Sequence, residues 1–151
     1  MNAASGTAER FDLVVIGAGQ AGPFLAANMV SQGKKVALVE ARALGGTCVN
    51  RGCTPTKTLR KSARVAYLAS RAAEFGVGVA QVKVDFAAAM NRMQQRVDEA
   101  RSGLERWLGG MAGLSLVQGH GRLQGRGAEG FIVRAGEREL IAPQVVLNTG
   151  T

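Results

Sequence analysis

The sequence is poor in histidine, cysteine, proline and aromatic residues. One histidine, His120, and 2 cysteines offer too few ligands for a typical metal site, so we expect no metal. With 3 prolines and 46% hydrophobic residues in 151, the chain is not disordered, collagen-like or of low complexity. The composition and length favour one globular domain with a packed core.

Acidic residues are also scarce, with 11 Asp and Glu against 19 Lys and Arg and a formal net charge of +8. The excess of bases is spread along the chain, and no basic run exceeds Arg60-Lys61. Aromatic residues make up 5% and do not interleave with the bases, as a nucleic-acid stacking platform requires. We therefore expect a solvated face, or one that meets the rest of a larger protein, rather than a nucleic-acid partner.

No segment has the pattern of a membrane span or a secretory signal. The uncharged stretch 13–33 is long enough to cross a membrane, but glycines, Pro23, Gln20 and Asn28 interrupt it. Residues 1–10 lack a positive segment followed by an apolar block, and we expect them to form a flexible leader. A cytoplasmic location is expected. Because the cytoplasm is reducing, the two cysteines are expected to have a chemical role rather than to form a structural disulfide.

The hydrophobic pattern predicts an α/β fold that begins with a βαβ unit. Residues 11–16 and 35–39 are apolar runs typical of buried strands, and the segment 20–32 between them suits a helix. Strand, helix and strand in about thirty residues form a right-handed crossover with parallel strands. The unit is therefore Rossmann-like, with a parallel sheet.

Two long helices are expected next. The first has Thr54 as its N-cap and Pro55 as its first residue, and it extends to Glu74. The second covers residues 85–108, with one narrow apolar seam: Phe86, Met90, Met93, Val97, Ala100, Leu104 and Trp107. We expect this seam to pack on the preceding helix; self-association as a coiled coil is the alternative.

The remainder of the chain has the pattern of short strands separated by glycine-rich turns. A small antiparallel meander between two strands of the main sheet is expected. The strand candidates are residues 114–117, 121–123, 131–133, 139–141 and 144–147.

A glycine motif between the first strand and helix predicts a dinucleotide site. Gly17-x-Gly19-x-x-Gly22 follows a buried strand, and Glu40 ends the next strand. Gly17 would turn the chain, Gly19 would let the backbone approach a pyrophosphate, and Gly22 would allow close helix–strand packing. The helix N-terminus would face the phosphates, and Glu40 would accept hydrogen bonds from ribose hydroxyls. The alternative is a tight turn with no ligand.

A second glycine-rich segment holds both cysteines. In a regular helix, residues five apart lie roughly 8.7 Å apart at Cα, beyond the disulfide range of about 4.4–6.8 Å. The segment from Cys48 to Cys53 must therefore be irregular if the two are to bond. Gly52 and Pro55 permit this, and they would place Cys53 at a helix N-terminus with Lys57 one turn on, an environment that favours thiolate. Two unrelated buried cysteines are the alternative.

Together these motifs resemble the flavoprotein pyridine nucleotide–disulfide oxidoreductases (class I). The resemblance covers residues 11–151 and is nearest to mercuric reductases and their FAD-containing relatives, with dihydrolipoamide dehydrogenase and glutathione reductase as cousins. It rests on the glycine motif, Glu40, the segment G-G-T-C-V-N-x-G-C-x-P-T-K, Gly119-His120-Gly121 and Asn148-Thr149-Gly150.

The resemblance implies FAD as the cofactor and a role for each matched residue. Cys53 would be the charge-transfer thiol beside the flavin, Cys48 the interchange thiol that meets substrate, and Lys57 a cation near the flavin's reactive nitrogen. The pyrophosphate would lie near the three glycines and the ribose on Glu40. The remaining cofactor-binding residues would be Gly46 and Thr47 on the flavin side, His120 and Gly121 along the adenine, and Thr149 and Gly150.

Family members are much longer, so residues 11–151 are expected to be the first half of an FAD-binding domain. NAD(P)H-binding and dimerisation domains would follow in a homodimeric parent enzyme, and the 151-residue chain alone is expected to be inactive. Electrons would pass from NAD(P)H to FAD, to Cys53 and Cys48, and then to a small-molecule disulfide, metal ion or other acceptor. The alternatives are part of a dihydrolipoamide dehydrogenase-like enzyme, a catalytically silent FAD- or ADP-binding module produced by truncation, and a basic nucleic-acid binder.

Overall fold

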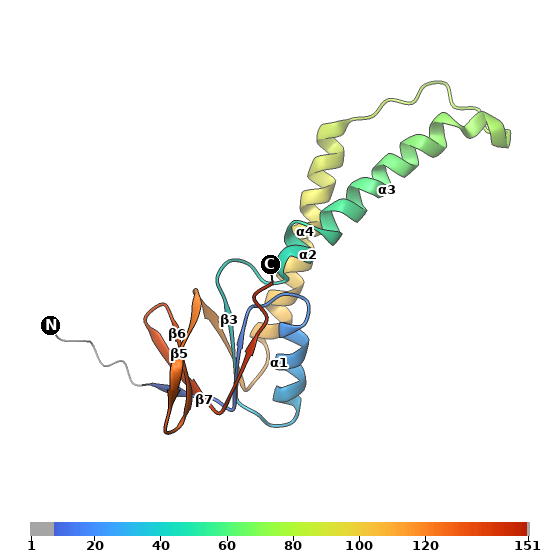
Figure 1. The fold of residues 1–151 in the computed structure, drawn as a ribbon. Helices are drawn as coiled ribbons and strands as arrows, with labels where there is room; N and C mark the ends of the chain where they lie inside the picture. Colours follow the sequence, from blue (N-terminus) through green and yellow to red (C-terminus); the bar gives the residue numbers. More distant parts are fainter. Residues whose placement is uncertain (1–7, 151) are drawn as a thin grey trace.

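A computed structural model describes residues 8–150 as an α/β fold with two four-stranded sheets and a projecting pair of helices (Figure 1). The main sheet has the order β4-β3-β2-β8, and all its strands are parallel. Helix α1 (Gly22–Ser31) connects β2 to β3. The expected βαβ unit is confirmed. The strands are β2 (Leu13–Ile16), β3 (Val36–Glu40), β4 (Leu114–Gln118) and β8 (Gln144–Leu147).

The main sheet is buried on both faces, which explains why its first two strands are unbroken apolar runs. Val14 and Ile16 face the second sheet and belong to one core cluster. Leu13 and Val15 face the other way and pack with Ala26 of α1. All four strand residues are 5% exposed or less, so β2 is the centre of the domain.

The second sheet contains the expected antiparallel meander. Its order is β1-β7-β6-β5, in which β5, β6 and β7 pair antiparallel and β1 joins β7 in parallel. The meander lies between β4 and β8 in the sequence, as expected. The strands are β1 (Glu9–Arg10), β5 (Gly121–Gly127), β6 (Gly130–Ala135) and β7 (Arg138–Ala142).

Strand β1 corrects part of the leader expected over residues 1–10. Residues 1–7 lie outside the described part of the chain, but Glu9 and Arg10 form a strand. The Glu9 carboxylate accepts hydrogen bonds of 2.7 and 2.8 Å from Arg138 in β7. Because that partner is far away in sequence, local composition gave no sign of the pairing.

The helices begin and end differently from the sequence expectation. Helix α3 (Cys53–Ser70) has Gly52 rather than Thr54 as its N-cap, and a 3-10 turn, η1 (Ala72–Phe75), replaces its expected last turn. Pro55 is its third residue, where a missing N–H costs nothing because the first turn has no intrahelical acceptor for it. A short helix, α2 (Gly46–Asn50), lies within the second glycine-rich segment and contains Cys48.

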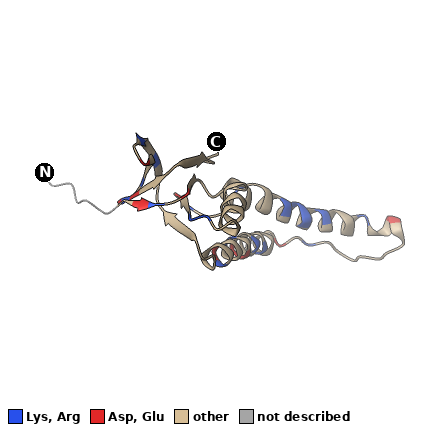
Figure 2. Ribbon diagram, turned by 90° about the horizontal axis from the view of Figure 1, so that it is seen from below, with Lys and Arg blue, Asp and Glu red and all other residues tan. Residues whose placement is uncertain are grey.

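Helix α4 (Phe86–Gly109), with Asp85 as its N-cap, packs on α3. The expected seam serves this contact only in part, because Leu104 packs against the core of the main sheet and Trp107 against Phe24 of α1. The seam is deepest at Val97, which is 3% exposed, whereas Phe86 at the outer end is 70% exposed. The basic residues of α3 all fall between positions 57 and 64, and the part of the helix toward Ser70 has none (Figure 2). Among the described residues, no helix combines the length and apolarity needed to span a membrane.

Candidate functional site

The glycine turn follows the carboxyl end of β2 and is closed by tight contacts. Gly17 has φ +105°, a conformation that favours glycine. A Cβ built on Gly22 would lie 2.3 Å from the Gly17 carbonyl oxygen, so a side chain at Gly22 does not fit. The first turn of α1 can therefore lie directly against the end of the strand.

The second glycine segment touches the first. Gly45 donates a backbone hydrogen bond of 2.8 Å to the Ala18 carbonyl oxygen, and the Gln20 side chain donates one of 3.2 Å to the Gly45 carbonyl oxygen. A Cβ on Gly46 would lie 2.8 Å from the Gly19 Cα atom. The two glycine segments thus pack directly against each other. A side chain introduced at Gly46 would displace the backbone of the first segment as well as its own.

Glu40 occupies the carboxyl end of β3, beside the glycine turn. Its Oε2 accepts a hydrogen bond of 2.8 Å from the Ala18 amide, and its Oε1 accepts one of 2.8 Å from the Arg42 amide. An ionised carboxylate has about four acceptor positions, so each oxygen can still accept another hydrogen bond. Glu40 is therefore held in place without losing its ability to bind hydroxyl groups.

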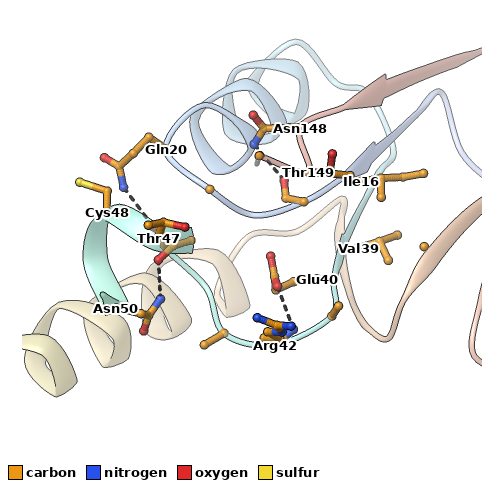
Figure 3. A pocket seen from close by; sticks show the side chains of 18 of the residues that line it. Ile16, Gln20, Val39, Glu40, Arg42, Thr47, Cys48, Asn50, Asn148 and Thr149 are labelled. Carbon is orange, nitrogen blue, oxygen red and sulfur yellow. Dashed lines mark hydrogen bonds between the residues drawn. The ribbon is translucent and has the colours of Figure 1, made fainter. Parts of the chain in front are cut away.

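These elements surround a cavity of about 660 Å³ (Figure 3). It brings together residues from the ends of β2, β3, β4 and β8 and from α2. Gly22, Cys53 and Lys57, which were expected in the site, are not among its lining residues. The expected residues that do line it are Gly17, Gly19, Glu40, Gly46, Thr47, Cys48, His120, Gly121, Thr149 and Gly150.

The segment after β4 closes one side of the cavity. Gly119 donates a hydrogen bond of 2.9 Å to the Glu40 carbonyl oxygen, which extends the pairing of β4 with β3. A Cβ on Gly121 would lie 2.8 Å from the Ile16 Cγ2 atom, so glycine keeps this wall close to β2. The His120 side chain between these glycines is exposed.

Sequence reasoning missed several polar residues of the cavity. Gln20, Arg42, Asn50, Arg51 and Asn148 all line it. Asn50 donates hydrogen bonds of 2.9 Å to the carbonyl oxygens of Leu44 and Gly46, and so holds α2 onto the preceding loop. The only sequence signal for these residues was their position inside or next to the motifs.

The two thiols sit on either side of a break between helices. Cys48 is in α2 and half-buried, Cys53 is the first residue of α3 and exposed, and both are free thiols. Gly52 between them has φ −118° and ψ −100°, so the helix is interrupted there, as disulfide formation would require. A hydrogen bond with Cys53, together with desolvation, raises the pKa of Cys48, and the charge of Lys57 opposes this.

Comparison with known proteins agrees with this geometry. The sequence profile of the pyridine nucleotide-disulphide oxidoreductases matches residues 11–151. The chain belongs to this family. The expected relationship to disulfide oxidoreductases is therefore confirmed at the level of the family.

Among family members, the chain is 36% identical to a dihydrolipoyl dehydrogenase of Chlorobaculum parvum over 99% of the chain and 32% of the relative. It is 35% identical to that of Bacillus subtilis over 95% of the chain and 32% of the relative. The chain thus spans about a third of the length of these curated relatives.

The solved structures give the same fold. A Cu(II) complex of the HOCl-induced flavoprotein disulfide reductase RclA from Escherichia coli matches with a TM-score of 0.71 and 28% identity, over 94% of this chain and 29% of that one. These relatives support the family, but none of them is named as a mercuric reductase. The finer resemblance to mercuric reductases stays a prediction.

Proposed function

We propose that this chain binds FAD in the cavity at the carboxyl ends of the main sheet. In the whole protein it would be the flavin- and thiol-bearing part of an NAD(P)H-dependent disulfide oxidoreductase. One observation supports this most directly: the glycine turn, Glu40 and Cys48 line one cavity of about 660 Å³. Open parallel sheets bind ligands at this edge, outside the carboxyl ends of the strands.

The residues present fit a dinucleotide. The cavity volume lies within the usual range for ligand pockets, roughly 300–1,000 Å³. At Gly17, Gly22 and Gly46 a Cβ would lie under 3 Å from neighbouring backbone, so these glycines let the backbone segments of the site pack closely together. Gly17, Gly19 and Gly46 line the cavity, so this part of its wall is backbone that phosphates would approach. Glu40 would bind the adenosine ribose through its remaining acceptor positions.

The charges around the cavity suit a pyrophosphate. Helix α1 has no side-chain cap at its N-terminus, so the N–H groups of its first turn, apart from the one that Pro23 lacks, would be available to an anion. Arg42 and Arg51 line the same cavity. Thr47, Gly46 and Cys48 would then border the flavin, while His120 and Gly121 would border the adenine.

The thiol pair would carry out exchange with substrate. The Cys48 thiolate attacks one sulfur of a disulfide substrate and forms a mixed disulfide, and the released thiolate takes up a proton. The Cys53 thiolate then attacks the Cys48 sulfur, which forms the Cys48–Cys53 disulfide and releases the second substrate thiol. Lys57, four residues beyond Cys53 on α3, stabilises thiolate in this region. FAD, when bound, would supply the two-electron chemistry that returns the disulfide to the dithiol with NAD(P)H as donor.

The relatives indicate the general chemical class of the electron acceptor. Two dihydrolipoyl dehydrogenases about one-third identical to the chain favour a small disulfide as the acceptor. The Cu(II) in the RclA structure supports a metal ion as an alternative acceptor. Homodimerisation and a cytoplasmic location of the whole protein belong to the same proposal.

The test is a titration of the purified chain with FAD, followed by two-electron reduction. A bound, yellow flavin that gains a long-wavelength absorption band on reduction is expected, because the Cys53 thiolate would lie beside the ring. Cys53→Ser should abolish the band, whereas Cys48→Ser should retain it. FAD binding without a band in the wild type would instead support the catalytically silent module, and absence of binding would refute the proposal.

A further inference from the structure

Asn148 lies directly beside Gly17, because β8 and β2 run parallel in register. Ile16 pairs with Leu147, and the Asn148 amide then donates a hydrogen bond of 2.8 Å to the Ile16 carbonyl oxygen. The Asn148 side chain also donates, from Nδ2 to the Gly17 carbonyl oxygen at 3.1 Å (Figure 3). One residue at the end of β8 therefore contacts the glycine turn through backbone and side chain.

The glycine motif surrounds this side chain. A Cβ on Gly22 would lie 2.9 Å from Asn148 Nδ2, and one on Gly19 would lie 3.6 Å from it. A Cβ on Gly17 would lie 2.2 Å from the Asn148 carbonyl oxygen. The absence of side chains at Gly17 and Gly22 thus makes room for Asn148, whereas a Cβ on Gly19 would be in ordinary contact with it.

The peptide group between Gly17 and Ala18 is held from both sides. In a trans peptide the C=O and N–H groups point in opposite directions. Asn148 binds the Gly17 carbonyl oxygen at 3.1 Å, and Glu40 accepts from the Ala18 N–H at 2.8 Å. Side chains from the ends of two different strands therefore fix the orientation of this one peptide.

We propose that Asn148 is a positioning residue for the phosphate-binding turn. This inference rests on the proposed FAD site and adds a specificity: Asn148 strengthens the binding of ligands that carry a pyrophosphate. Gly19 and Gln20, which follow the held peptide, line the cavity, so rotation of that peptide would move the backbone that faces the phosphates. The adenosine ribose would be bound by Glu40 and does not need the Asn148 hydrogen bond.

Asn148→Leu separates the hydrogen bond from the shape of the side chain, because leucine is nearly isosteric with asparagine but cannot donate. FAD, ADP and adenosine are titrated against the wild type, Asn148→Leu and Asn148→Ala. The Kd for FAD and ADP should rise about 3- to 10-fold in both variants, as loss of a partly buried neutral hydrogen bond implies. The Kd for adenosine should rise less, because Glu40 keeps its hydrogen bond of 2.8 Å from the Arg42 amide. A wild-type Kd for ADP in Asn148→Leu, or an equal loss for adenosine, would overturn the inference.

A second measurement needs no ligand. In Asn148→Leu, amide hydrogen exchange should speed up at Ala18, whose N–H bonds to Glu40, and stay unchanged at Lys35, whose N–H bonds to Asp12 at 2.7 Å. Unchanged exchange at Ala18 would show that Asn148 does not hold the peptide. If the wild type binds neither FAD nor ADP, the proposed function fails and takes this inference with it. If the wild type binds both and the variants bind both with the same Kd values, only the role of Asn148 fails.

Discussion

The Glu40 carboxylate accepts a hydrogen bond of 2.8 Å from the amide of Ala18, the residue after the first glycine of the motif. The carboxylate proposed to bind ribose and the turn proposed to bind phosphates are therefore one hydrogen-bonded unit. Because Glu40 also accepts from the Arg42 amide at 2.8 Å, the same side chain shapes the loop after β3.

Glu40→Ala should weaken FAD binding by about 1.5–3 kcal/mol, the usual cost of losing a hydrogen-bonded charged group. Adenosine binding should weaken as well, because ribose contacts are lost directly. Equilibrium dialysis of the variant beside Glu139→Ala, an exposed acidic residue of β7, measures the difference. Equal FAD retention in all three proteins would remove Glu40 from the site.

Gly22→Ala should destabilise the fold by about 1–3 kcal/mol, the typical cost of overpacking. Its new Cβ would lie 2.3 Å from the Gly17 carbonyl oxygen, and backbone there cannot easily shift. Gly103→Ala is the matched control, because this glycine is inside α4 with nothing within 4 Å of its Cβ position. The control should be stabilised by about 0.5–1 kcal/mol. Urea unfolding that ranks the two variants the other way would contradict the packing argument.

In the reduced chain without FAD, iodoacetamide should label Cys53 before Cys48 at neutral pH. Alkylation requires thiolate, and the raised pKa of Cys48 lowers its thiolate fraction until the pH passes that pKa. Cys53 is also the more exposed of the two. With FAD bound the order should reverse, since the flavin would cover Cys53. Mass mapping after a brief pulse decides both cases, and labelling of Cys53 first in the presence of FAD would reverse the proposed thiol roles.

Glu9→Gln should destabilise the fold at pH 7 by about 0.5–1 kcal/mol, a small value because Glu9 and Arg138 are 41% and 38% exposed. Hydrogen bonding from Arg138 lowers the pKa of Glu9, so this stabilisation is present above the ordinary carboxyl pKa and is lost as the pH falls through the lowered one. Wild type and variant should thus converge in denaturant titrations as the pH falls below the lowered pKa of Glu9. A difference that stays constant through the acidic limb of the titration would show that charge is not involved.

Much of the site could be predicted from the sequence because it depends on local physics. The apolar runs of β2 and β3 are recognisable because both faces of a central parallel strand are buried. Gly17 requires a positive φ, and Gly22 must lie against a backbone carbonyl, so each position excludes side chains. These requirements appear in the sequence as a spacing of glycines next to Glu40.

Other features were decided only by tertiary structure. The strand at Glu9 depends on Arg138, and the place of Asn148 depends on the register of β8 with β2, in each case across more than a hundred residues of chain. Helix α3 begins at Cys53 because the chain turns at Gly52 between α2 and α3, and Pro55 is tolerated two residues later. Local propensity determined the elements and the turn chemistry. Pairing between distant strands, which no local pattern encodes, decided which side chains meet at the cavity.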